Sequence, residues 1–170
     1  MRLLPTFFAT LAVLLPLAAA QRAQAQVLRF ATDSTAPIDL AAGLMVWQRA
    51  SGLAQLNQDA QMRQGPLTLS ADQLVIKFAY DGAAENISAD GQVVLLSAAR
   101  GDSAPRRATA RQAFVDLADQ TIILTGNVTM TEGADVARQL SGARLRLDMV
   151  SGRARLTGGA DKPRARIELR

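Results

Sequence analysis

The stretch Ile122–Gly133, Ile-Ile-Leu-Thr-Gly-Asn-Val-Thr-Met-Thr-Glu-Gly, decides the fold. Its apolar residues alternate with polar ones, so a pleated strand places the apolar set on one face. Gly126 and Asn127 interrupt the run, but the apolar parity resumes unchanged after them. This favours a bend or bulge in one long curved strand over a tight hairpin turn. Because Leu140–Met149 repeats the one-sided pattern, we expect antiparallel sheet with one apolar face.

The same unit recurs along the chain. Residues 58–65 align with residues 126–133, and a weaker copy lies between them. The expected bend points are Gln58, Gly91, Gly126 and Gly158, at spacings of 33, 35 and 32 residues. Such spacing is typical of stacked units that bury a face only against their neighbours. Since no segment after the amino-terminal apolar run has a helical stripe, the sequence predicts an all-β fold.

The amino terminus has the features of a secretory signal. Its apolar core is short and contains Pro16, and Ala23-Gln24-Ala25 has the small-x-small form of a cleavage site. We expect cleavage before Gln26, with cleavage before Gln21 or an uncleaved anchor as alternatives. The expected division is a signal peptide at 1–25, an arm at 26–36, a β domain at 37–160 and a basic edge strand or tail at 161–170.

Composition excludes several kinds of site. The chain has no cysteine and no histidine, which removes disulfides, Ser-His and Cys-His catalysis and histidine-bound zinc. Residues 26–135 hold 8 Lys/Arg and 12 Asp/Glu, net −4, whereas residues 136–170 hold 9 and 3, net +6. The basic end predicts a solvated tail or an anionic partner such as phosphate. With 4% aromatic residues, nucleic-acid binding is not expected.

An enzyme is the main alternative from another functional class. A β-solenoid polysaccharide lyase or hydrolase would need carboxylates on one exposed strip at repeat spacing. The nearest candidates are Asp59, Asp90, Asp116 and Asp119. Each lies beside a turn or bend, where aspartate is favoured for backbone reasons. We therefore predict no enzymatic activity, no cofactor and no metal site.

Three stretches resemble a known family. Pro37-Ile38-Asp39-Leu40, the run Leu124–Gly133 and the return Leu140-Ser141-Gly142-Ala143 resemble the OstA-like domain of LptA-type periplasmic lipopolysaccharide-transport proteins. The likeness spans Pro37 to about Gly159. The first copy departs from the family pattern, with Gln-Asp-Ala at 58–60 where Gly-Asn-Val is usual, and the third copy lacks the asparagine.

The resemblance implies a β-jellyroll of two antiparallel sheets, wrapped as a slightly open, twisted stack with an apolar interior. It implies a periplasmic carrier that holds the acyl chains of lipopolysaccharide (lipid A), and assembly through edge strands into head-to-tail homo-oligomers. It also implies partners similar to LptC at the inner membrane and to LptD at the outer membrane, as part of outer-membrane biogenesis. The alternatives are a membrane-anchored sibling similar to LptC and a ligand-free β-solenoid scaffold or adhesin. Because the sequence ends at Arg170, we do not expect the barrel of the translocon itself.

Alternation and the resemblance together give the candidate sites. An aliphatic interior with few bulky aromatic residues suits flexible chains, since burial of each CH₂ contributes about 0.8 kcal/mol; an ordinary filled core is the alternative. The predicted lipid-binding interior is Leu56, Met62, Leu69, Leu74, Ile76, Phe78, Val93, Leu95, Ile122, Leu124, Val128, Met130, Leu145, Leu147 and Met149. The predicted assembly edges are Pro37, Ile38, Asp39, Leu40, Arg153, Arg155 and Leu156. Alternatively, Arg153, Arg155, Arg164 and Arg166 lie at the mouth of a groove and bind lipid phosphates.

Overall fold

The computed structural model describes residues 28–101, 104–133, 138–158 and 164–167. Within these ranges the chain forms 11 strands and one 3₁₀ turn, Arg49–Ser51. The strands are β1 (Leu28–Arg29), β2 (Ile38–Ala41), β3 (Leu44–Gln48), β4 (Leu53–Gln64), β5 (Leu67–Phe78), β6 (Ala84–Ser97), β7 (Arg106–Asp116), β8 (Thr121–Glu132), β9 (Arg138–Asp148), β10 (Arg153–Thr157) and β11 (Arg164–Ile167). All pairings are antiparallel, and consecutive strands from β4 to β10 are neighbours in one sheet. The predicted all-β fold is confirmed.

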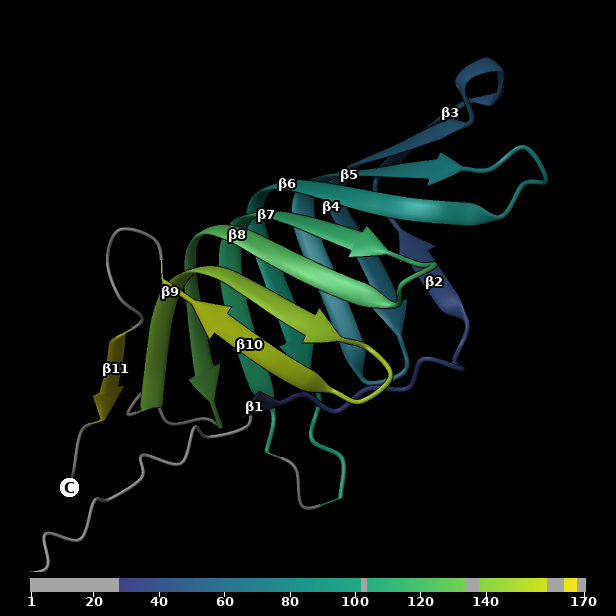
Figure 1. Cartoon of the computed structure of the whole chain (residues 1–170). Coiled ribbons are helices and arrows are strands. Elements are labelled where there is room, and N and C mark those ends of the chain that lie inside the picture. Colours follow the sequence, from purple (N-terminus) through teal and green to yellow (C-terminus); the bar gives the residue numbers. More distant parts are fainter. Residues whose placement is uncertain (1–27, 102–103, 134–137, 159–163, 168–170) are drawn as a thin grey trace, which may run out of the picture.

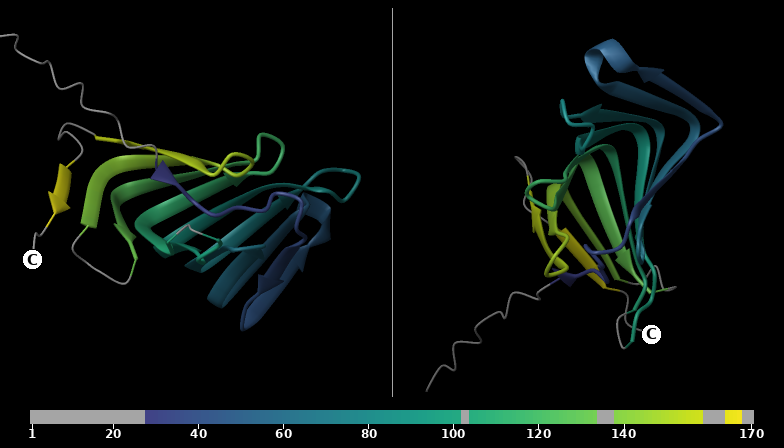
Figure 2. Two further views of the ribbon diagram at one scale, coloured as in Figure 1. Left: turned by 90° about the horizontal axis from the view of Figure 1, so that it is seen from below. Right: turned by 90° about the vertical axis from the view of Figure 1, so that its right-hand side faces the viewer.

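The long strands bend near their middles, and the bends line up across the sheet (Figure 1). The register shifts in β4 between Asn57 and Ala60, and in β8 between Thr125 and Val128, with matching shifts in the strands between them. Each bent strand therefore contributes one half to each of two layers of a single folded sheet. Layer A contains β3, β10, β1 and the halves of β4 to β9 that lie between them. Layer B contains β2, β11 and the remaining halves of β4 to β9. The right-hand view of Figure 2 shows the two layers diverging from the bend.

Left-handed backbone produces the bends. Gly126 and Asn127 have φ of 82° and 52°, which confirms the expected bend within one continuous strand, β8. A Cβ on Gly126 would lie 2.9 Å from the Cβ of Arg111 on β7, so the neighbouring strand also requires glycine here. In β4, Gln58 and Asp59 adopt the same conformation, with φ of 62° and 56°, without glycine. The departure from the family pattern therefore keeps the bend, at a cost in backbone strain.

The fourth expected bend point, Gly158, follows the last residue of β10. β10 ends at Thr157 in layer A and β11 begins at Arg164 in layer B, and both pair with β9. The chain thus changes layer after Thr157, but between two separate strands and not within one.

The amino-terminal segment, for which an arm or a first edge strand was expected, begins with an edge strand: Leu28 and Arg29 form β1 and pair with Ala154 and Arg153 of β10. At that point β1, and not β10, is the edge of layer A.

Candidate functional site

The inner faces of the two layers form one apolar interior. Of the fifteen residues predicted for it, all except Phe78 are at most 2% exposed, and Phe78 is half-buried against the same cluster. Polar residues of opposite parity, such as Thr129, face outward and keep partial exposure. Alternation thus identified the buried face correctly. The side chains pack against one another as in an ordinary core.

Several interior residues were missed by the sequence analysis. Ile87 and Val115 lie on the inward parity of β6 and β7 and are buried. The other missed residues are mostly alanines: Ala54, Ala60, Ala89, Ala108 and Ala113. Alanine carries little hydrophobic signal, so only the pairing register identifies these positions. Their small side chains allow the two layers to approach closely.

The apolar face continues past the buried interior at the amino-terminal end of the sheet. On β3, Met45 pairs with Leu56 and Trp47 pairs with Ala54, so both side chains continue the inner face of layer A. They are nevertheless 49% and 61% exposed. Trp47 stacks on Phe78 with ring centroids 5.1 Å apart. The interior therefore ends in a bare apolar surface.

A short segment bridges the two layers on the side where they diverge. We call residues Phe30–Ala36 the strap. Its first residue, Phe30, is 4% exposed, and its N–H donates to the carbonyl of Gly152 at the rim of layer A (2.7 Å). The next N–H, of Ala31, donates to Ser97 Oγ at the rim of layer B (2.9 Å), and this hydroxyl donates back to the carbonyl of Ala31 (3.1 Å). The strap thus joins the two rims.

The rest of the strap runs along the rim of layer B to β2, as Figure 2 shows. Gln64 Nε2 donates to the carbonyls of Ser34 and Ala36 (3.2 and 3.1 Å). Arg100 donates to the carbonyl of Thr32 and lies 3.6 Å from the Asp33 carboxylate. A hydrogen bond from the Thr35 hydroxyl is the main cause of a lowered pKa at Asp33, to which the backbone N–H of Thr35 and the charge of Arg100 add. Polar groups of layer B therefore hold the strap mainly through its backbone.

Arg106 links the strap to the sheet. Its guanidinium pairs with Glu132 at 2.8 Å and lies 5.9 Å from the centroid of the Phe30 ring. The side chain is only 13% exposed, and its Nε and Nη1 are buried without a hydrogen-bond partner. Buried N–H groups without partners are costly. At this rim, Nε and Nη1 of Arg106 are therefore donors that could still donate to a hydrogen-bonding partner.

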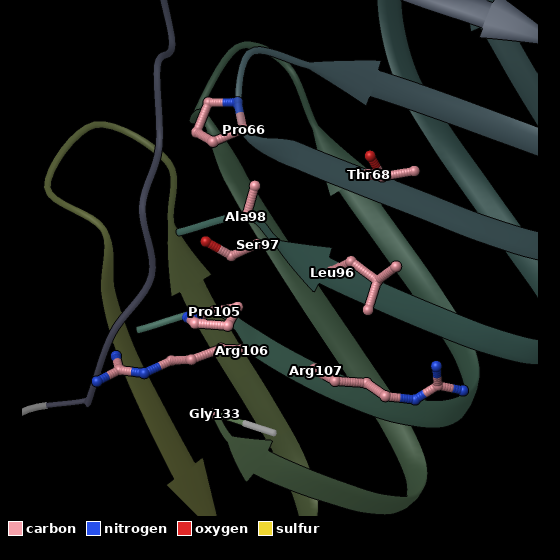
Figure 3. Close-up of a pocket in the computed structure, with 9 residues that line it drawn as sticks. All are labelled: Pro66, Thr68, Leu96, Ser97, Ala98, Pro105, Arg106, Arg107 and Gly133. Atoms are coloured by element: carbon pink, nitrogen blue, oxygen red, sulfur yellow. The ribbon is translucent and has the colours of Figure 1, made fainter. Parts of the chain in front are cut away.

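A shallow pocket of about 360 Å³ lies at the same rim. Figure 3 shows Arg106 extending toward the strap, while Arg107 and Leu96 lie on the other side. The pocket is mainly apolar, and Leu96 is 39% exposed. Its lining residues are Pro66, Thr68, Leu96, Ser97, Ala98, Pro105, Arg106, Arg107 and Gly133. No local sequence pattern predicts this pocket, because loops distant in the chain form its wall.

The candidate carboxylates have local structural roles. Asp90 accepts a hydrogen bond from Gln112 Nε2 (2.8 Å), and Asp116 accepts the N–H of Asp119 in its own turn (2.9 Å). Asp59 lies in the bend of β4. Across the described ranges, no three acidic residues gather into a group suited to a metal ion.

The structure orients two of the four arginines considered as ligands for lipid phosphates. Arg153 and Arg155 are exposed and point away from the interior, because the alternating residues Ala154 and Leu156 pack against the core. Arg164 and Arg166 belong to β11, which pairs with β9, but their side chains lie outside the described structure.

The predicted edge residues of β2 lie at the margin of layer B. Asp39 pairs with Arg63, and Ile38 and Leu40 are half-buried against the core, with Pro37 exposed just before them. At the other end, Leu156 pairs with Leu145.

A family model described as "LptA/(LptD N-terminal domain) LPS transport protein" matches residues 44–153. The chain belongs to this family. It is a family of lipid-transport proteins and not of enzymes, as the resemblance predicted. No curated protein is matched by the chain.

The fold also matches a solved member of this group. The structure of LptH from Pseudomonas aeruginosa, described as "the LptA homologous periplasmic component of the conserved lipopolysaccharide transport device", has a TM-score of 0.65. The alignment covers 82% of this chain and 99% of LptH at 14% identity. At this identity the likeness establishes the fold, an LptA-like β-jellyroll. Among the described residues, no helix has the length and hydrophobicity needed to cross a membrane.

Proposed function

We propose that this LptA-family protein is a periplasmic carrier that holds lipopolysaccharide acyl chains between its two layers and passes the lipid toward the outer membrane. The observation that carries the proposal is the continuity of the apolar surface. This surface runs through the buried interior and continues onto β3, where Met45 and Trp47 are exposed to solvent. A carrier that hands over its lipid needs such a path, whereas a ligand-free scaffold does not.

Lipid uptake requires the layers to separate, because side chains fill the interior. The layers diverge from the bend, so an opening movement parts the rims. The strap joins those rims through Phe30, Gly152 and Ser97. We propose that release of the strap from one rim accompanies lipid entry. Replacing contacts among side chains by contacts with CH₂ groups, each contributing about 0.8 kcal/mol, provides the driving force.

Site-specific photo-crosslinking tests the interior. Leu124 and Ile123 are neighbours on β8, but Leu124 is buried and Ile123 faces outward with partial exposure. A photoreactive residue at position 124 should label lipopolysaccharide in the envelope, and the same residue at position 123 should not. Mass spectrometry of lipids extracted from the purified protein supplies an independent reading. Equal labelling at both positions, or no bound acyl lipid, would refute the carrier.

We further propose that the end strands mediate assembly, with an LptC-like protein, an LptD-like protein or a second copy of the chain. Among the described strands β3 has one neighbour, β4, and its other edge offers backbone groups for strand addition. Charge contributes little at this end, because Asp39 is the only acidic residue in β2 and β3. The exposed apolar side chains of β3 are therefore the expected source of affinity.

Processing separates the proposed soluble carrier from an anchored LptC-like sibling. The small-x-small site before Gln26 favours cleavage. Amino-terminal sequencing of the exported protein should find Gln26, or Gln21, as the first residue. A full-length chain that stays with membranes after a high-salt wash would favour the anchored sibling.

A further inference from the structure

The outer face of layer A carries a cluster of arginines at the end of the sheet that β9, β10 and β1 form. We call it the arginine face. All five side chains are exposed. They come from three neighbouring strands, β1, β10 and β9, and are Arg29, Arg144, Arg146, Arg153 and Arg155.

The strand register brings these like charges together. Arg29 lies directly opposite Arg153, and Arg146 lies directly opposite Arg155. Like charges at directly opposed positions of an antiparallel pair destabilise the sheet. Salt bridges within the described ranges involve Lys77, Arg100 and Arg106 as the cations, and none includes an arginine of this face.

One acidic residue, Asp148, lies beside the cluster; hydrogen bonds from Ser151 are the main cause of its lowered pKa, to which the charge of Arg146 adds. The carboxylate of Asp148 accepts the backbone N–H of Ser151 at 2.7 Å and that of Val150 at 3.0 Å, together with the Ser151 hydroxyl. It stabilises the turn between β9 and β10. The arginine face therefore has an excess of positive charge that the fold itself does not require.

We propose that the arginine face binds the phosphate-bearing headgroup surface of an anionic lipid membrane. The guanidinium fork matches phosphate oxygens. At standard strand spacing, three strands and four residues of length span roughly 10 by 13 Å, which is wider than a single phosphate group. Beside it Val150, in the turn that leads into β10, is 65% exposed and adds an apolar contact. This binding does not depend on a lipid in the interior.

A second copy of the chain fits the arginine face poorly. Head-to-tail continuation of layer A would bring β3 next to this end of the sheet. The outward residues of β3 are Leu44, Val46 and Gln48, which carry no charge. An assembly of that kind would leave the arginines without counter-charge.

Vesicle co-sedimentation tests the proposal. The purified chain should bind vesicles of phosphatidylcholine with phosphatidylglycerol, bind weakly to phosphatidylcholine alone, and lose affinity as salt is raised. The double variant Arg146→Gln, Arg155→Gln should weaken binding roughly 25-fold, since each arginine near an anionic surface contributes about 5-fold. Its melting temperature should not fall, because the change removes a repulsive pair. If it does fall, Arg155→Gln alone, with about 5-fold expected, replaces it.

The matched control is Arg63→Gln with Arg107→Gln. These exposed arginines lie on layer B, and their loss changes the net charge equally. The control should bind as the wild type does; an equal loss would make binding a matter of net charge and overturn the proposal. Binding that ignores phosphatidylglycerol would overturn it too. Full displacement by inorganic phosphate would assign the face to free phosphate, and binding to poly-glutamate but not to vesicles would assign it to an acidic protein.

Discussion

β8 and β3 both place apolar side chains on the inner face of the sheet, but the two strands bury them to different extents. On β8, Leu124 and Val128 have a neighbouring strand on each side and a facing layer, and they are at most 1% exposed. On β3, Met45 and Trp47 share the inner face, but within the described part of the chain this strand pairs with β4 alone, and both side chains are about half exposed. The contrast teaches that alternation specifies a face, whereas neighbours decide whether that face is buried. β3 is an unfinished part of the interior.

The largest effect is expected from a charge placed in the buried interior. Val128→Asp places an unpaired carboxylate in the interior and should destabilise the fold by on the order of 4 kcal/mol. Thr129→Asp, one residue away on the outward face, should stay within about 1 kcal/mol. Chemical denaturation of both variants measures the difference. Similar losses would mean that the two faces of β8 are not distinct.

The next largest effect concerns the strap, which joins the rims of the two layers. Phe30→Ala removes the buried side chain of the strap and should cost about 3 kcal/mol, the lower end for Phe to Ala at buried sites. Ser34→Ala is the control, because Ser34 contributes its carbonyl to Gln64. Hydrogen exchange of the strap amides reports detachment directly. Unchanged protection in Phe30→Ala would show that the backbone contacts alone hold the strap.

Changes on β3 should affect binding more than folding. Trp47→Ser removes an exposed aromatic residue, so the free energy of unfolding should change by less than about 1 kcal/mol. Affinity for the partner or for a second copy should fall at least tenfold, since buried tryptophans are frequent hot spots of interfaces. Tyr80→Ser is the matched control, being fully exposed in a turn. Light scattering and pull-down with an LptC-like partner measure the two effects, and equal loss in both variants would argue against β3 as the edge.

The smallest effect is a pH dependence of the strap. Hydrogen bonds from Thr35 lower the pKa of Asp33, so its ionised form stabilises the docked strap. This contribution is complete above the ordinary aspartate pKa of about 4 and is lost as the pH falls through the lower value of the folded protein. The protection factors of the strap amides, which correct for the intrinsic pH dependence of exchange, should therefore fall at acid pH in the wild type. Asp33→Asn should flatten that response; an unaltered profile would assign it to another group.

The sequence predicted local features well, because they depend on neighbours in the chain. The parity of Val128 and Leu145 fixed the buried face, and the glycine at position 126 fixed the bend. The orientation of Arg153 and Arg155 was also contained in their alternation with Ala154 and Leu156. Two interpretations of these arginines, an assembly edge and a phosphate site at the mouth of a groove, were nevertheless left open. The sequence alone does not say which edge of the sheet lies beside the interior.

Non-local features were out of reach. Ser97 and Ala31 are 66 residues apart when they exchange hydrogen bonds, and nothing in either segment indicates the other. The strand β1 has two residues, too few for any periodicity. The inward alanines are identified only by register. The strap, the edge of layer A and the cross-strand arginine pairs therefore required the structure.

The pairing of Leu28 with Ala154 has a consequence for the order of folding. From β4 to β10 each strand pairs with the one that follows it in sequence, so hairpins close short loops and add to the sheet one after another. The contact between β1 and β10 instead closes a loop that contains nearly the whole domain, and such contacts gain little until the intervening structure exists. We expect a slow final kinetic phase in which β1 docks, and deletion of Leu28 and Arg29 should abolish that phase while leaving the earlier ones unchanged.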